Sequence, residues 1–234
     1  MRLRIAFDLD GVLADMTAAL GMHADALFEQ GTSRSPVADS DGSEAEQNDE
    51  EAALRPATLA LTSSQRRRLW NHVRGIQNFW ETLSELETGC VARLAAVATD
   101  HHWEVIFLTR RPESAGSTAQ VQTQRWLQSK GFPFPSVFVL QGSRGRVASA
   151  LALDVVVDDQ LDNCLDVVAD SKAKPILVWR DSTHPIPQNA QRLGITVVPS
   201  VAECLELLLK ENPPPRRSSV FARAMDALGR RGNS

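Results

Sequence analysis

The chain has 234 residues, of which 43% are hydrophobic and 23% charged, and its formal net charge is −4. This length and balance predict a soluble globular protein with one substantial core plus an insertion or a small second domain. The weak negative charge excludes the basic footprint of a nucleic-acid-binding protein. The sequence carries neither a signal peptide's apolar segment nor the roughly 20 apolar residues of a membrane span. We therefore expect a cytoplasmic protein whose partners include no nucleic-acid polymer and no membrane.

Three cysteines are widely spaced along the chain, at Cys90, Cys164 and Cys204. Their number is odd, and none of them forms a C-x-x-C pair. This pattern favours reduced thiols in a cytosolic protein over a disulfide framework or a zinc site.

The first predicted strand, Leu3–Phe7, is followed by two aspartates one residue apart, Asp8 and Asp10, and then by Gly11. Alternate side chains of a strand point to opposite faces, so the two carboxylates lie on the same side. Like charges held close together repel unless a cation or a shared proton compensates them. The pattern indicates a site for something positive, although an acidic strand end that caps backbone amides is the simpler alternative for this short motif taken alone.

A long insertion follows this strand. Its middle, at about residues 31–57, is acidic and lacks large apolar side chains, so it cannot bury enough surface to fold. We predict that this part is a disordered linker. Order returns near Thr62, which with Gln65 predicts a helix capping box ahead of apolar residues at helical spacing.

The second half of the chain alternates strands with helices. Continuous β-branched runs without polar alternation are typical of parallel strands that are covered on both faces. Such runs lie at Glu104–Thr109, Ser136–Leu140, Leu153–Asp159, Pro175–Trp179 and Ile195–Val198. Stretches with helical spacing separate them, for example from Ala119 to Lys130. This alternation predicts an α/β fold with a doubly wound, Rossmann-like parallel sheet and right-handed crossovers.

Ligands of such folds bind beyond the carboxyl ends of the strands. Three of the first four predicted strands end in polar side chains, at Asp8 and Asp10, at Thr109 to Arg111, and at Asp158 and Asp159. This coincidence across three separated segments carries more weight than one pair of aspartates. We expect these strand ends to form a single site.

Three segments together resemble a known family. AFDLDGVLAD, VIFLTRRP and DVVVDDQLDN are similar to motifs one, two and four of the haloacid dehalogenase (HAD) superfamily of phosphohydrolases. The spacing and the paired aspartates of the last segment are most similar to the 5'(3')-deoxyribonucleotidase branch. The resemblance covers the α/β half well and the insertion only thinly. The fourth motif departs from its commonest form, because Gln160 and Leu161 stand where many relatives carry arginine and proline.

The resemblance implies hydrolysis of a phosphomonoester through an aspartyl-phosphate. The substrate is anionic, so an anionic nucleophile can approach it only when a metal neutralises the charges, and oxygen ligands suit Mg²⁺. Asp8 is the expected nucleophile and a metal ligand. Asp10 is expected to protonate the leaving oxygen and then to activate water, while its backbone carbonyl binds the metal.

The resemblance also implies roles for the other strand ends. Asp159 is the expected direct Mg²⁺ ligand, with Asp158 acting through a metal-bound water. Thr109 matches the hydroxyl that hydrogen-bonds the transferring phosphoryl group. Gly11 and Arg110 are expected to lie against the substrate, Gly11 because the absence of a side chain lets the backbone turn away at once.

The family uses a lysine to offset the charge of the nucleophile and the phosphate, and that lysine has no clear counterpart here. The helix after the second motif offers Gln122, Thr123 and Arg125, and the segment QGSRGR offers Arg144 and Arg146. Arg144, in a loop aimed at the site, is the expected substitute. Arginine keeps the charge but presents it as a planar fork, so the replacement is not neutral.

HAD proteins of this kind carry a helical cap after the first strand. The resemblance places the cap at residues 15–96 and the core at 1–14 and 97–210. The proline break and the basic composition of residues 211–234 predict a disordered tail. Because a cap encloses the site, it favours a small soluble substrate over a phosphoprotein.

Phe79 and Trp80 resemble the aromatic cap segment that contacts the nucleobase in deoxyribonucleotidases. We therefore include both among the candidate substrate-binding residues. Packing in the core is the competing role for each ring.

These observations predict a Mg²⁺-dependent HAD-type phosphatase that acts on a small phosphorylated metabolite, with a nucleoside monophosphate as the leading substrate. One alternative is a catalytically weak HAD-like protein that binds phosphorylated ligands or partners, which the missing lysine favours. Another is a phosphatase for a different small metabolite, such as a sugar phosphate. The sequence determines neither the substrate nor the oligomeric state.

Overall fold

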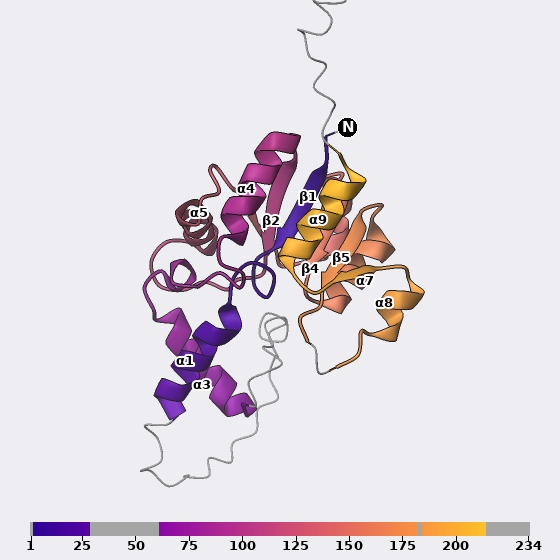
Figure 1. The fold of residues 1–234 in the computed structure, drawn as a ribbon. Helices are drawn as coiled ribbons and strands as arrows, with labels where there is room; N and C mark the ends of the chain where they lie inside the picture. Colours follow the sequence, from indigo (N-terminus) through magenta and orange to yellow (C-terminus); the bar gives the residue numbers. More distant parts are fainter. Residues whose placement is uncertain (1, 29–60, 182–183, 214–234) are drawn as a thin grey trace, which may run out of the picture.

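The computed structural model describes residues 2–28, 61–181 and 184–213. In these residues six parallel strands form one sheet in the order β3-β2-β1-β4-β5-β6. The strands are β1 (Arg4–Asp8), β2 (Glu104–Thr109), β3 (Ser136–Val139), β4 (Val155–Asp158), β5 (Lys174–Val178) and β6 (Thr196–Val198). The predicted α/β fold with a doubly wound parallel sheet is confirmed (Figure 1).

Helices connect and cover these strands. They are α1 (Met16–Phe28), α3 (Ser63–Arg74), the 3₁₀ helix η2 (Phe79–Glu81), α4 (Cys90–His101), α5 (Ala119–Ser129), α6 (Arg144–Ala150), α7 (Leu161–Asp170), α8 (Gln188–Arg192) and α9 (Val201–Glu211). The capping box predicted at the start of α3 is confirmed, because the side chains of Thr62 and Gln65 each accept a hydrogen bond from the other's backbone N–H.

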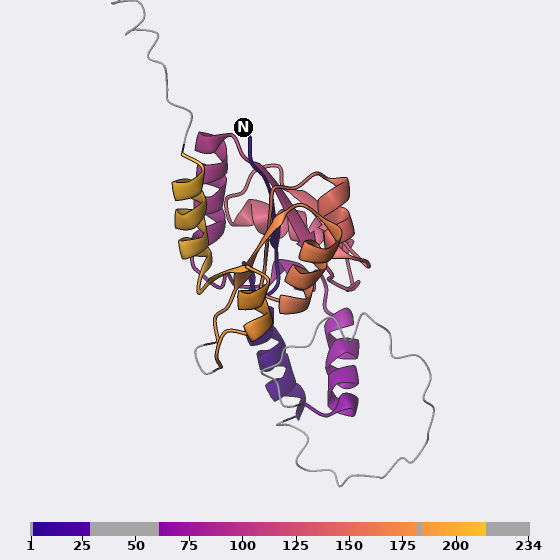
Figure 2. The same ribbon diagram turned by 90° about the vertical axis from the view of Figure 1, so that its right-hand side faces the viewer.

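The sheet is buried on both faces. Ile5 and Phe7, on one face of β1, belong to a large apolar cluster that also contains residues of α4, α5 and α9. Ala6, on the other face, packs in a second cluster with residues of α6 and α7. Figure 2 shows α4 and α9 side by side along one side of the sheet. Because helices cover both faces, a ligand can reach the sheet at the carboxyl ends of its strands.

The strand order brings the predicted site residues together. β1 lies between β2 and β4, with Asp8 beside Leu108 and Phe7 beside Val157 in the register of the sheet. The ends of these three strands therefore meet at one edge. The chain order reverses between β1 and β4, and such a switch point is where ligands of open α/β sheets bind.

Two helices project beyond the carboxyl end of β1. α1 directly follows the loop after β1, and α3 lies against it (Figure 1). α4, whose first residues fall within the segment predicted as the cap, packs beside α9 on the sheet. The predicted linker at about 31–57 and residues 214–234 of the predicted tail lie outside the described residues.

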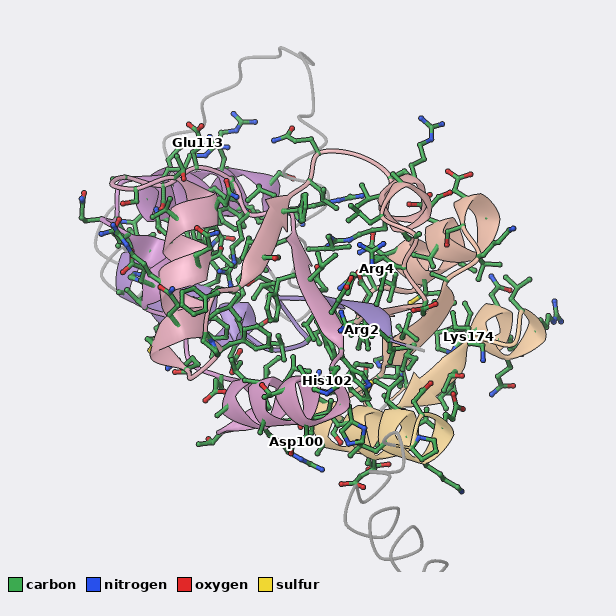
Figure 3. The ribbon with its side chains drawn as sticks, turned by 90° about the horizontal axis from the view of Figure 1, so that it is seen from above. Arg2, Arg4, Asp100, His102, Glu113 and Lys174 are labelled. Atoms are coloured by element: carbon green, nitrogen blue, oxygen red, sulfur yellow. The ribbon has the colours of Figure 1, made fainter. Side chains whose placement is uncertain are left out.

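The opposite edge of the sheet carries charged side chains at the amino ends of the strands. Arg4, His102 and Lys174 lie at this end of the molecule (Figure 3), and the Arg4 Nε donates to Glu104 at 2.7 Å. An exposed pair of this kind contributes little to stability. The polar groups with a specific arrangement lie instead at the carboxyl edge.

Two further predictions concern the cysteines and membrane-spanning helices. The three cysteines are free thiols, as the sequence predicts, and the structure places all three in buried positions. Within residues 2–28, 61–181 and 184–213, no helix combines the length and the apolar character needed to span a membrane.

Candidate active site

Asp8 lies at the centre of the site. It is the last residue of β1, its side chain is buried, and the Arg144 Nη2 donates a hydrogen bond to its Oδ1. Burial raises the pKa of Asp8 well above its usual value, and the neighbouring carboxylates of Asp158, Asp159 and Asp10 add to this rise, while Arg144 opposes it. Asp8 therefore needs more positive charge than Arg144 alone provides in order to remain a carboxylate.

The backbone turns sharply directly after these aspartates. Gly11 has a φ of +89°, and its N–H donates to the carbonyl of Ala14 at 3.1 Å. A Cβ atom at this glycine would lie 2.1 Å from the Asp159 Oδ2. Glycine at position 11 therefore permits both the left-handed turn and the close approach of the Asp159 carboxylate.

Asp159 presents a carboxylate oxygen to the site. Its Oδ2 accepts a hydrogen bond from the Gln160 side chain at 2.9 Å, whereas its buried Oδ1 has no hydrogen-bond partner among the described residues. Burial and the neighbouring Asp158 raise the pKa of Asp159 to about 7. A buried oxygen without a donor is costly unless a ligand satisfies it.

Asp158, the neighbouring residue, has a different environment. Its carboxylate accepts hydrogen bonds from the Gln160 backbone N–H at 2.9 Å and from the Asn163 side chain at 3.0 and 3.1 Å. It also forms an ion pair with the Arg144 Nε at 3.3 Å. Asp158 thus anchors the start of α7 and orients Arg144.

The residues present fit a magnesium ion. The available donors are oxygens, the Asp159 Oδ1 is unsatisfied, and Gly11 leaves room for that carboxylate. In the part of the chain that the structure describes, no three acidic, histidine or cysteine side chains converge closely enough to hold a metal by themselves. A Mg²⁺ ion bound here would take Asp8 and Asp159 and fill its other positions with a backbone carbonyl, waters and phosphate oxygens, as Mg²⁺ commonly does.

Arg144 is the first residue of α6 and points into the site. Ser143 caps this helix by accepting from the Arg146 N–H at 3.0 Å, and Gly145 lets α6 approach α7 closely, since a Cβ there would lie 2.1 Å from the Asp166 carbonyl oxygen. The Arg144 side chain is buried, and within the described ranges its Nη1 has no hydrogen-bond partner. Burial lowers the pKa of Arg144, but Asp8 and the other carboxylates outweigh that effect and raise it. The position predicted to replace the family's lysine thus lies against the predicted nucleophile.

Asp10 lies two residues beyond β1, outside the strand whose alternation predicted it on the same side as Asp8, and it pairs with a second arginine next to the end of β2. The Arg111 guanidinium donates to both carboxylate oxygens, from Nε at 3.1 and 2.9 Å and from Nη2 at 2.8 Å. Thr109 donates to the Asp10 Oδ2 at 3.2 Å. The Thr109 hydroxyl therefore lies at the site, where it contacts Asp10.

Arg111 follows the second predicted strand, and its residue type and position alone assign it no role. It is buried, and its Nη1 donates to the Thr123 hydroxyl at 2.9 Å. Its charged centre lies 4.9 Å from the centroid of the Trp80 ring and 5.9 Å from that of Trp126. The available signal was its position two residues after Thr109, which placed it at the same edge as the aspartates.

The remaining predicted substrate-binding residues are placed as follows. The Arg110 Nη2 donates to the Gly142 carbonyl at 3.2 Å, and its buried Nε has no partner in the described chain. Phe79 and Trp80 are both fully buried, with the Trp80 indole N–H donating to the Pro112 carbonyl at 2.9 Å. Neither ring has a face open to a ligand in this conformation, and both pack in the core.

A third arginine fixes the loop after β1. Arg180 donates to the carbonyls of Gly11 and Val12, at 2.7 and 3.1 Å, and pairs with Glu87 at 2.5 Å. Glu87 also accepts from two backbone N–H groups at the start of α9, at 2.7 and 2.9 Å. Burial raises the pKa of Glu87, but these hydrogen bonds and Arg180 outweigh it and lower the pKa overall. The network connects the turn at Gly11 to the segment after β5 and to the start of α9, and no local pattern in the sequence indicates it.

Comparison with known proteins identifies the type of fold. No family model and no curated protein matches the sequence. A HAD family hydrolase from Deinococcus radiodurans R1, solved with bound phosphate and sodium, matches with a TM-score of 0.56 and 16% identity over 92% of this chain and 99% of its own.

Two further solved structures give the same result. A HAD-superfamily hydrolase from Geobacter sulfurreducens PCA matches with a TM-score of 0.52 and 15% identity over 88% of this chain and 96% of its own. A haloacid dehalogenase-like family hydrolase from Xanthomonas campestris matches with a TM-score of 0.51 and 14% identity over 90% of this chain and 96% of its own. At these identities the likeness establishes a HAD-like fold for this chain, and it does not resolve a branch.

Proposed function

We propose that this chain is a Mg²⁺-dependent phosphomonoester hydrolase of the HAD type that acts through an aspartyl-phosphate on Asp8. One observation carries the proposal. A buried carboxylate at the carboxyl end of the central strand faces a buried arginine, and unsatisfied atoms flank the pair, namely the Arg144 Nη1 and the Asp159 Oδ1. The first suits a phosphoryl oxygen and the second a cation.

The residues have distinct roles in this reaction. A carboxylate oxygen of Asp8 attacks the phosphorus, and the bond to the leaving oxygen breaks. Arg144 donates to the phosphoryl oxygens, with the Thr109 hydroxyl as a second donor. Asp10 gives a proton to the leaving oxygen and later accepts a proton from the attacking water. We propose Gly11 and Arg110 as residues that line the phosphate, because the turn and the unpartnered Nε of Arg110 lie at this edge.

A bound Mg²⁺ supplies the positive charge that this cluster requires. Three other carboxylates act on Asp8, and each of them raises its pKa. Two buried arginines, Arg144 and Arg111, face these four carboxylates, so two negative charges are left over. A divalent ion held by Asp8 and Asp159, with Asp158 in support, neutralises the excess and keeps the nucleophile ionised.

We propose a small phosphorylated metabolite as the substrate, because α1 and α3 project beyond the edge that carries the site (Figure 1). In this proposal residues 15–96 form the cap. Among such metabolites the nucleoside monophosphates are the first to test, on the strength of the motif resemblance. The burial of Phe79 and Trp80 gives no separate support for stacking on a base.

The test is phosphate release from an aryl phosphate and from a panel of nucleoside monophosphates and sugar phosphates, with Mg²⁺ and with EDTA. We expect turnover that depends on Mg²⁺ and that Asp8→Asn reduces to background. Asp100→Asn, an exposed aspartate at the opposite edge of the sheet, is the matched control and should retain full activity (Figure 3). The ranking within the panel then identifies the substrate class.

A second function is favoured by the two ion pairs themselves. The carboxylates of Asp8 and Asp10 are each held by a buried arginine, which also suits a protein that binds a phosphorylated ligand without turning it over. Folded protein that releases no phosphate above the Asp8→Asn background, yet is stabilised by phosphorylated compounds in thermal melts, would establish this binding function in place of the hydrolase.

A further inference from the structure

We propose that Arg111 is a positioning residue that holds the Asp10 carboxylate as the general base for hydrolysis of the aspartyl-phosphate. The inference rests on the proposed function and deepens it, because it gives Arg111, to which the motif resemblance assigns no role, the task of orienting Asp10. Its basis is the geometry around Arg111.

The contact between the two side chains fixes an orientation. The Nε and Nη2 of Arg111 bind the two oxygens of Asp10 in a side-on fork, with the shortest contacts at 2.9 and 2.8 Å. Such a bidentate pair sets the plane of the carboxylate, which a single point charge does not. Rotation of Asp10 about its side-chain bonds therefore breaks several hydrogen bonds to Arg111 at once.

The Arg111 side chain is itself fixed by hydrogen bonds and by contacts with two tryptophan rings. Each of its three side-chain nitrogens donates to a named acceptor, with the Nη1 bound to Thr123, which in turn donates to the Ala119 carbonyl at 2.7 Å. The Trp80 ring, from the segment between α3 and α4, and the Trp126 ring, from α5, pack near the guanidinium. The Trp80 N–H groups are bound as well, to Pro112 and to the Gln122 side chain at 2.9 and 3.0 Å.

Stability does not explain this arrangement. The side chains of Arg111 and Asp10 are 0% and 7% exposed, and burying such a pair costs about as much desolvation as its attraction returns. Replacing a buried pair of this kind by apolar residues of similar size is often neutral or stabilising. The pair lies beside the predicted nucleophile, at the ligand-binding edge, where a fixed carboxylate has a chemical use.

The step assigned to the pair is balanced as follows. A water oxygen forms a bond to the phosphorus of the aspartyl-phosphate while the bond from phosphorus to the Asp8 oxygen breaks. The electron pair of that bond returns to Asp8 as a carboxylate, and one water proton moves to Asp10. Arginine pairs with the carboxylate form of an aspartate, which is the form that accepts this proton.

The experiment separates formation of the aspartyl-phosphate from its hydrolysis. Wild type, Arg111→Lys and Arg111→Met are mixed rapidly with 4-nitrophenyl phosphate and Mg²⁺, since this leaving group needs no proton. Nitrophenolate release reports formation, and protein-bound phosphate in acid-quenched samples reports the intermediate. We expect a burst in both variants, accumulation of the intermediate, and steady-state hydrolysis slowed by about 100-fold in Arg111→Met and less in Arg111→Lys.

Arg125→Met is the matched control. Arg125 also joins α5 to the segment that contains Trp80, through Glu81 at 3.2 Å, but it is half exposed and does not contact Asp10. It should show wild-type burst kinetics. In an Asp10→Asn background, Arg111→Lys should add little further loss, because the two residues act as one unit.

The inference is overturned by any of three results. The first is that the burst rate and the steady-state rate fall together. The second is that Arg111→Lys is folded and matches wild type, and the third is that the losses of the two single variants add in the double variant. Melting curves of both Arg111 variants identify loss of fold, and the lysine variant, which keeps the charge, keeps the test decisive if the methionine variant unfolds. Failure of the wild type to release phosphate contradicts the proposed function instead.

Discussion

Two arginine–aspartate pairs flank β1. One pair is complete, because each nitrogen of its arginine has an acceptor, and the other is incomplete. On the β2 side, Arg111 pairs with Asp10, and each nitrogen of the arginine has an acceptor. On the β4 side, Arg144 pairs with Asp8, and in the described residues the Arg144 Nη1 and the Asp159 Oδ1 have none. Each side holds a buried arginine and a buried aspartate within one short stretch of the same sheet edge.

The difference indicates where a ligand belongs. Buried polar atoms are satisfied in nearly all native structures, so an unsatisfied donor and an unsatisfied acceptor beside one nucleophile mark positions that a ligand fills. The complete side needs nothing added and therefore serves to hold Asp10 in place. In this comparison the phosphate and the metal bind on the β4 side, and the Asp10 side provides the proton transfers.

The largest expected effect comes from removing the arginine on the incomplete side. Arg144→Leu leaves Asp8 and Asp158 buried without their shared cation, and such a change costs about 3–5 kcal/mol of the free energy of unfolding. Urea unfolding in EDTA at pH 7.5 measures it. Arg144→Lys keeps a positive charge and should recover part of the loss.

Mg²⁺ should affect the stability of variants on the two sides of β1 differently. Mg²⁺ should restore stability to Arg144→Leu, because a cation bound beside Asp8 replaces the missing charge. It should stabilise Arg111→Leu no more than it stabilises wild type, because in that variant the site of Asp8 and Asp159 keeps its own cation, Arg144. Equal recovery in the two variants would contradict the assignment of the metal to the β4 side.

A smaller effect is expected at the turn that follows the aspartates. Gly11→Ala combines the cost of a left-handed backbone with a Cβ placed 2.1 Å from the Asp159 Oδ2. Gly89→Ala is the matched control, because Gly89 has a φ of +79° and nothing within 4 Å of its added Cβ. The control should cost about 1–2 kcal/mol from the backbone alone, and Gly11→Ala should cost clearly more in urea unfolding. Equal losses would mean that Asp159 moves aside freely and does not depend on Gly11 for its position.

Much of this arrangement follows from the sequence. Continuous β-branched runs that alternate with helical spacing predicted the parallel sheet, and the polar ends of three of those runs predicted which residues meet at its edge. The lone Thr62 and Gln65 pair predicted a helix start that the structure confirms. These successes share a cause, since strand alternation and capping depend on residues close together in the chain.

The rest depended on contacts between distant segments. Arg111 is defined by Trp80 and Trp126, which lie 31 and 15 positions away in the sequence, and Glu87 caps α9 from more than a hundred residues before it. No local pattern in the sequence predicts contacts between residues so far apart in the chain. Phe79 and Trp80 show the same limit, because an aromatic pair at a helix end has the same sequence whether its rings face a ligand or the core.

The smallest expected effect tests the unsatisfied oxygen of Asp159 directly. Burial raises the pKa of this carboxyl to about 7, above its value in the unfolded chain, so between about pH 4 and 7 the folded protein binds the additional proton. Metal-free protein therefore gains stability from this group as the pH falls through 7, and loses that gain as the pH rises. Mg²⁺ requires the carboxylate and should reverse the trend, raising the melting temperature more at pH 8 than at pH 5.5. A difference of about 1 kcal/mol corresponds to about 2–4 °C for a chain of this size. Asp159→Asn should reduce the difference to the part that Asp8 contributes, since burial also raises the pKa of Asp8, whereas Asp100→Asn should preserve it. If Mg²⁺ raises the melting temperature of Asp159→Asn as much as that of wild type, the oxygen left without a partner is not where the metal binds, and the ion belongs with Asp8 alone.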